Sequence, residues 1–202
     1  MIFTWCQKQK SDFTFLHCLT STCWKNEWRS EIIMAHGSSN LCEEAILFKK
    51  GVDCIIHSVL GTVFHTKSWA EILINVYAPD KDANIIKFLI NLLMALEKKN
   101  FDEEENIITG GHFNCPHNPI LDKKGGLLIP RKSVATTNEN LQELHLVDIW
   151  RVKNPERKSF TWSQNSPMIF CRLDYRLIAN TFVSNKWLRK EWIGNDCFGN
   201  NG

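Results

Sequence analysis

The chain has 202 residues, enough for one sizeable domain or two small ones, and it can bury a core without disulfides or metals. Its 44% hydrophobic and 23% charged residues are typical of a soluble globular protein rather than of a disordered chain. The net charge of +2 is too small to indicate nucleic-acid binding, and it does not exclude such binding.

The first part of the sequence predicts a series of short strands. Residues 2–10 predict a short amphipathic helix, and β-forming residues between turn-forming clusters predict strands at 12–16, 31–35, 45–48 and 54–59. The strongest strand pattern covers residues 71–77 and is closed by Pro79. Both faces of this strand are mostly apolar, which predicts a strand that is covered on both sides.

A helix is predicted directly after this strand. Asp82 suits its N-cap, and apolar residues from Ile85 to Leu96 keep helical spacing along one stripe. An acidic loop at 102–105 leads into a strand that begins at Ile107. This strand runs into Gly110-Gly111, which predicts a tight turn that lets a ligand or another backbone come close.

The second half of the sequence is less regular. Residues 115–137 are predicted to form a loop and residues 138–145 a helix, which 146–151 continue or follow with a short strand. Two more strands are predicted at 159–163 and 172–178, whereas residues 196–202 suggest disorder. Together the elements predict an α/β fold of the α+β type, in which helices flank a two-sheet β-sandwich.

Several motifs occur in a characteristic order along the chain. They are Asn75-Val76-Tyr77-Ala78-Pro79, Gly110-Gly111-His112-Phe113-Asn114, the segment 146–151 (LVDIWR), Phe160-Thr161-Trp162 and Arg172-Leu173-Asp174-Tyr175. This series resembles the exonuclease–endonuclease–phosphatase superfamily, and its order is similar to the endonuclease domain of LINE-type non-LTR retrotransposons. The resemblance implies a DNase I-like domain over residues 1–185 that lacks the first and last strands, followed by a divergent tail at 186–202.

The resemblance also implies a function. Its members would hydrolyse DNA phosphodiester bonds with Mg²⁺, nicking DNA in the nucleus to prime reverse transcription. Such a site places a hard cation on the phosphate oxygens and activates a water molecule, while neutral side chains hydrogen-bond the phosphoryl oxygens. DNA would be the partner, and neither a membrane nor a small-molecule cofactor is expected. The scattered cysteines and the absence of a signal peptide favour an intracellular location.

The resemblance assigns roles to individual residues. Asn114 would orient the nucleophilic water and the phosphoryl group, and Tyr77 would donate a hydrogen bond to a phosphate oxygen. Thr161 would add a polar contact, and Asp174 would polarise a histidine or organise the site. As alternatives, Tyr77 and Thr161 are ordinary strand residues, and Asp174 is a structural ion-pair partner of Arg172 or Arg176.

Four departures from the family pattern predict that the chain is catalytically inactive. His112 stands where the family has an aspartate, and histidine is a poor ligand for Mg²⁺ although it can act as a general base. The strand at 12–16 runs into residues 17–20 (HCLT) and so lacks the metal-binding glutamate. The strand that carries a catalytic asparagine and the C-terminal S-D-H element are not found. Loss of an acid–base group alone costs about 10²–10⁴-fold in rate.

Other hypotheses remain open beside this one. In the second hypothesis, the chain is a non-catalytic module that binds DNA through basic residues at 151–158 and through Lys123, Lys124, Arg131 and Lys132. In the third, it is a remnant of a mobile element without a selected function. Alternatively, the spacing of His112, Cys115 and His117 forms a site for Zn²⁺ or Mn²⁺.

Overall fold

A five-stranded sheet forms the centre of the computed structural model, which describes residues 13–20, 32–36, 41–48, 63–66, 71–97, 106–127 and 131–184. Its strands follow the order β4-β5-β6-β11-β8. Their bounds are Val63–Thr66 for β4, Glu71–Tyr77 for β5, Asn106–His112 for β6, Asp174–Ala179 for β11 and Leu146–Asp148 for β8. Among the strands that the structure describes, only β5 and β6 pair in parallel, and helix α3 (Asp82–Glu97) supplies the crossover that a parallel pair requires.

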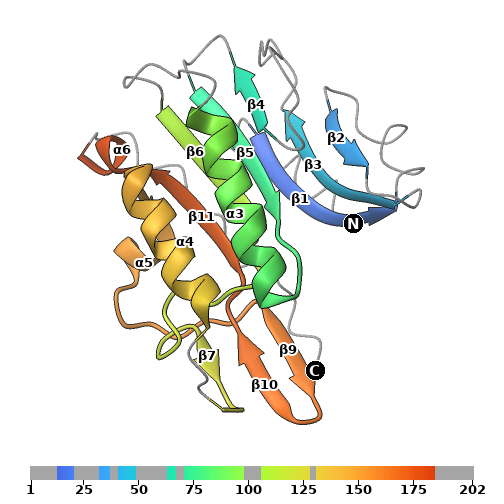
Figure 1. The fold of residues 1–202 in the computed structure, drawn as a ribbon, viewed down its shortest axis with the longest axis vertical. Coiled ribbons are helices and arrows are strands. Elements are labelled where there is room, and N and C mark those ends of the chain that lie inside the picture. Colours follow the sequence, from blue (N-terminus) through green and yellow to red (C-terminus); the bar gives the residue numbers. More distant parts are fainter. Residues whose placement is uncertain are drawn as a thin grey trace.

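A three-stranded sheet faces one side of this central sheet, and helices cover the other (Figure 1). The smaller sheet has the order β1-β3-β2, with bounds Phe13–Thr20, Leu41–Phe48 and Ile32–His36. Because successive residues of a strand point to opposite faces, β5 contacts the helices with one face and the smaller sheet with the other. Ile74 and Val76 pack toward Phe88 and Leu92 of α3, whereas Asn75 Nδ2 donates to the Ala45 carbonyl of β3 at 3.1 Å.

The second half of the chain completes the helical layer. Helix α4 (Lys132–Glu143) lies beside α3, and the short helices α5 (Ile149–Lys153) and α6 (Asn180–Ser184) follow β8 and β11 (Figure 1). A third small sheet, β7-β10-β9, consists of Lys123–Lys124, Met168–Cys171 and Trp162–Asn165. In the part of the chain that is described, no helix combines the length and apolar character of a membrane span.

Some of the sequence predictions need correction. Helix α4 begins at Lys132 rather than at 138, because its buried residues include the polar Ser133 and Thr137, which leave no apolar stripe. The strand predicted at 159–163 begins only at Trp162, and β4, β7 and β10 were not predicted. The helix predicted at 2–10, the strand at 54–59 and the tail after 185 lie outside the described residues.

Gly110 and Gly111 do not form the predicted turn. Strand β6 continues through both residues to His112, so that prediction is wrong. The expected close approach does occur: a Cβ atom on Gly111 would lie 2.1 Å from the carbonyl oxygen of Val76, and the φ angle of Gly111 is +135°. Glycine is needed here because β5 passes too close for any side chain.

Candidate active site

The predicted site residues meet at one edge of the central sheet. Tyr77 and His112 are the paired last residues of the parallel strands β5 and β6, and Asp174 is the first residue of β11 and pairs with His112 from the other side. Three neighbouring strands therefore bring these side chains together. This edge corresponds to the carboxyl ends of the parallel strands, where ligands bind in many α/β proteins.

His112 is the centre of a small polar cluster, which we call the His112 cluster and which consists of Tyr77, His112, Asn114 and Asp174. The Nδ1 atom of His112 lies 3.0 Å from Oδ1 of Asp174, and its Nε2 atom lies 2.9 Å from Oδ1 of Asn114. The ring of Tyr77 stacks on the imidazole with 5.5 Å between centroids. The side chains of His112 and Asp174 are 14% and 11% exposed, so water still reaches the cluster.

The backbone fixes the orientation of Asn114. Its φ angle is +52°, a left-handed conformation that asparagine tolerates better than most residues. Its Nδ2 atom donates to the Ala78 carbonyl at 2.6 Å. The amide oxygen therefore faces His112, and Asn114 is held in a single orientation.

Thr161 contacts the backbone that carries Asp174. Its hydroxyl oxygen accepts hydrogen bonds from the backbone N–H groups of Leu173 at 3.0 Å and Asp174 at 3.2 Å. Thr161 precedes β9, and its hydrogen bonds fix the start of β11. Its hydroxyl therefore positions Asp174, in addition to any polar contact with a ligand. Arg172 does not pair with Asp174 as the alternative prediction proposed, because its guanidinium contacts two other carboxylates.

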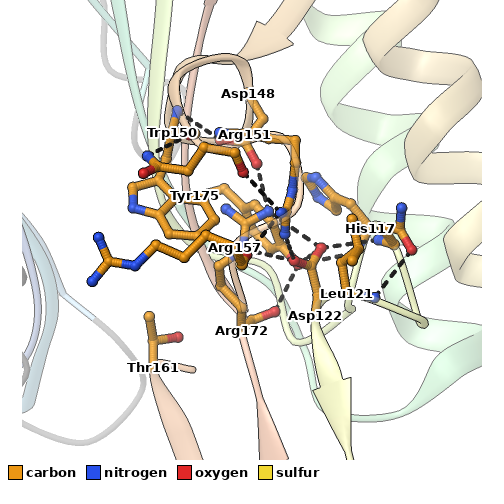
Figure 2. Close-up of polar contacts among 12 residues, drawn as sticks. His117, Leu121, Asp122, Asp148, Trp150, Arg151, Arg157, Thr161, Arg172 and Tyr175 are labelled. Atoms are coloured by element: carbon orange, nitrogen blue, oxygen red, sulfur yellow. Dashed lines mark hydrogen bonds and ion pairs between the residues drawn. The ribbon is translucent and has the colours of Figure 1, made fainter. Parts of the chain in front are cut away.

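Figure 2 shows a second polar cluster, which sequence reasoning did not predict. We call it the Arg172 cluster; its members are Asp122, Asp148, Trp150, Arg151, Arg172 and Tyr175. The fully buried carboxylate of Asp122 accepts from Arg172 Nε at 2.8 Å and from Arg151 Nη2 at 2.5 Å. Arg172 Nη2 also donates to Asp148 Oδ2 at 2.6 Å.

Charge pairing sets the ionisation of this second cluster. Burial disfavours the charged form of Asp122, but the hydrogen bonds and charge of Arg172, with further donors, hold the pKa of this carboxyl below its ordinary value. Burial likewise opposes the charge of Arg172, and Asp122 and Asp148 together raise its pKa. The guanidinium also lies between the rings of Trp150 and Tyr175, at 4.8 and 4.4 Å from their centroids.

His117 adjoins the Arg172 cluster as a neutral aromatic residue. Its ring stacks on Tyr175 at 3.6 Å with 8° between planes and meets the edge of Phe113 at 5.4 Å. The residue is half-buried overall, yet both ring nitrogens are shielded from solvent and have no hydrogen-bond partner. Burial, aided by the charge of Arg172, lowers the pKa of His117 to about 3. The sequence indicated His117 only as part of a candidate metal site, and no pattern predicted its burial.

The alternative metal site at His112, Cys115 and His117 is wrong. The Cys115 thiol is buried 3.4 Å from the Ser133 hydroxyl of α4, and burial raises its pKa. The three side chains thus lie in three different environments. Among the described residues no group of three such side chains is arranged to hold a metal ion.

The Mg²⁺ ion that the resemblance implies does not fit the described residues either. Mg²⁺ prefers near-octahedral oxygen ligands. Here Oδ1 of Asp174 and Oδ1 of Asn114 both face His112, while Asp122 and Asp148 pair with arginines. Asp82, at the start of α3, accepts a hydrogen bond from Ser133.

The architecture is shared with two solved structures. An AP endonuclease from Archaeoglobus fulgidus has a TM-score of 0.65 and 16% identity, and the match covers 89% of this chain and 80% of that protein. Truncated Caenorhabditis elegans TDP2 has a TM-score of 0.57 and 13% identity, over 83% and 71% of the two chains. The chain therefore has the DNase I-like fold predicted from its sequence, with two facing sheets and flanking helices.

The sequence is also similar to that of a transposon protein. Over 150 residues the chain is 28% identical to the Transposon TX1 uncharacterized 149 kDa protein of Xenopus laevis. The match covers 69% of this chain and 11% of that much longer protein. No protein-family model matches the sequence.

Proposed function

We propose that the chain is a retrotransposon-type endonuclease domain that has lost phosphodiester hydrolysis. The DNase I-like fold and the similarity to a transposon protein support the derivation. The contact of His112 with both Asp174 and Asn114 carries the proposal of inactivity, because it occupies the groups that would organise the site and orient the nucleophile. The related reaction would be Mg²⁺-dependent DNA nicking in the nucleus.

The first test is nicking of supercoiled plasmid in Mg²⁺ and in Mn²⁺. Wild type is compared with His112→Asp, which restores the family's carboxylate, and with Asn114→Ala. We expect no nicking by wild type above the Asn114→Ala background, with circular dichroism verifying that each protein is folded. Nicking by wild type that Asn114→Ala abolishes would contradict the proposed inactivity, and nicking by His112→Asp alone would identify His112 as the main lesion.

DNA binding without cleavage is the second candidate function, and the position of Arg131 favours it. Its guanidinium reaches the Asn114 carbonyl at 3.4 Å, so a positive charge lies beside the His112 cluster. Lys124 and Lys132 are exposed nearby along the chain, and Lys123 is half-buried. Exposed lysine and arginine side chains bind phosphates in a salt-dependent and sequence-independent way.

Charge reversal tests this binding. Arg131→Glu combined with Lys124→Glu and Lys132→Glu should weaken binding of duplex DNA and flatten its dependence on salt. Lys87→Glu, on the exposed face of α3, is the matched control and should change binding little. Absence of binding by wild type at low salt would rule out the binding function. A sharp cooperative thermal transition would argue against the remaining alternative, a decayed chain without a stable fold.

A further inference from the structure

We propose that one face of the small sheet β7-β10-β9 binds single-stranded nucleic acid by stacking bases on aromatic rings. This sheet extends beyond the ends of the central sheet and of helices α3 and α4 (Figure 1). The face, which we call the Phe170 face, consists of Lys124, Ser163, Asn165, Met168 and Phe170. The inference goes beyond the proposed function, because it concerns a different surface and holds whether or not the His112 cluster is active.

The strand register assigns these five side chains to one face. In an antiparallel pair, directly opposed residues point to the same side of the sheet. Phe170 of β10 is opposed to Lys124 of β7 and to Ser163 of β9, and Met168 is opposed to Asn165. Phe170 is half-buried and the other four residues are exposed, with Met168 at 65%. On both neighbouring strands, Phe170 is therefore flanked by polar residues that solvent reaches.

The ring of Phe170 lies beside a mobile positive charge. The Nζ atom of Lys124 lies over the ring, 5.8 Å from its centroid. On this side the ring is covered by an exposed lysine side chain, which a base can displace. The base takes the place of the ammonium group over the ring, and the ammonium group moves to a phosphate. Met168 lies about 7 Å from Phe170 along β10 and offers its thioether to the next base.

A second ring enlarges this aromatic surface. The ring of Phe160, which is half-buried, lies 5.8 Å from that of Phe170 with 40° between their planes. Lys158, two residues before Phe160, is exposed and adds positive charge, while no member of the Phe170 face is negatively charged. Aromatic rings next to lysines bind single strands with little sequence preference, since every base has a π-face. A duplex keeps these faces stacked on one another, so this surface should prefer single strands.

Fluorescence anisotropy with a labelled oligothymidylate of about 12 nucleotides, and with a duplex of the same length, tests this preference. We expect wild type to bind the single strand more tightly. Phe170→Leu removes the aromatic ring and should weaken single-strand binding at least about fivefold, with little change in duplex binding. Phe170→Tyr keeps a ring and should retain the affinity. Val152→Ser, which changes an exposed apolar residue of α5, is the matched control and should have no effect.

Met168→Glu provides a second variant, which is informative even if circular dichroism shows that Phe170→Leu fails to fold. It places a negative charge at an exposed position of the same face and should also weaken single-strand binding. A strand that carries 5-iodouracil, which crosslinks under light to aromatic rings on which it stacks, should label the segment 160–170.

Three results would overturn the proposal. They are absence of single-strand binding at low salt, equal loss of single-strand and duplex binding in Phe170→Leu, and a crosslink outside the segment 160–170. Plasmid nicking by wild type would contradict only the proposed inactivity, so failure of the two proposals can be distinguished.

Discussion

The two polar clusters that meet the start of β11 differ in how firmly their charges are fixed. In the Arg172 cluster, a fully buried carboxylate is bound by two arginines, whose guanidinium groups stay charged at every accessible pH. In the His112 cluster, the carboxylate is half-buried and its partner is a histidine. The first cluster joins three segments of the chain, whereas the second lies at the sheet edge where ligands bind in many α/β proteins. We therefore expect the fold to be maintained by residues other than those of the candidate site.

Removal of Arg172 should have the largest effect on stability. Arg172→Met keeps the length of the side chain but leaves the buried carboxylate of Asp122 with Arg151 as its remaining ion-pair partner. We expect the free energy of unfolding to fall by about 3–5 kcal/mol, because the cost of an under-compensated buried charge is large. Urea unfolding measures this change. Arg157→Met is the control; Arg157 is exposed, so that variant should change stability by less than about 0.5 kcal/mol.

A small effect of Arg172→Met on the free energy of unfolding would mean that the Arg172 cluster contributes no more to stability than the His112 cluster. The comparison above would then fail, since it depends on the Arg172 cluster being the structural one. His112→Asn, measured in the same way, should cost less than Arg172→Met because water reaches Asp174 and solvates its carboxylate.

His117, which adjoins the Arg172 cluster, sharpens the comparison through its neutral state. His117 stays neutral in the folded protein because burial lowers its pKa to about 3 from the ordinary 6.5. Between these two pH values the unfolded chain binds a proton that the folded chain does not. Stability contributed by this residue is therefore present above pH 6.5 and is lost as the pH falls toward 3, at up to about 1.4 kcal/mol per pH unit.

Replacement of His117 by phenylalanine tests this assignment. His117→Phe preserves the stacking on Tyr175 and the edge contact with Phe113, and it removes the group that titrates. We expect the loss of stability between pH 6.5 and 3 to become shallower, as measured by urea unfolding at several pH values. His145→Asn removes an exposed histidine and should leave the slope unchanged. An unchanged slope in His117→Phe would show that other groups cause the acid sensitivity.

Sequence patterns predicted those elements in which apolar residues recur with the period of a strand or of a helix. Strand β5 is apolar on both faces and α3 has one apolar stripe, and both occur where expected. Helix α4 begins earlier than predicted because it buries the polar residues Ser133 and Thr137. The Ser133 hydroxyl donates to Asp82 of α3, and the Thr137 hydroxyl donates to the Ser133 carbonyl within the helix. The sequence does not predict β7, which consists of two lysines, because these residues form a strand only through their pairing with β10.

The candidate site was predictable only in part, for a similar reason. The resemblance identified Tyr77, His112, Asn114 and Asp174, and the strand register brings them to one edge. The contact between His112 and Asp174 joins residues that are 62 positions apart, so no local pattern reveals it. Asp122 and His117 lie in a loop between β6 and β7. No motif indicated Asp122, and the only pattern that included His117 was the wrong metal site, since the importance of both residues comes from burial.

Thr161 links the two clusters, and its removal should have the smallest effect. Its hydroxyl accepts from the backbone of Leu173 and Asp174, which directly follow Arg172. Thr161→Val keeps the shape but leaves these two N–H groups without that acceptor, at a cost of about 1–2 kcal/mol in urea unfolding. Thr161→Ser retains the hydroxyl and should recover most of the loss. If serine fails to restore stability, the methyl group and its packing hold β11 in place, and Asp174 is then positioned by its pairing with His112 instead.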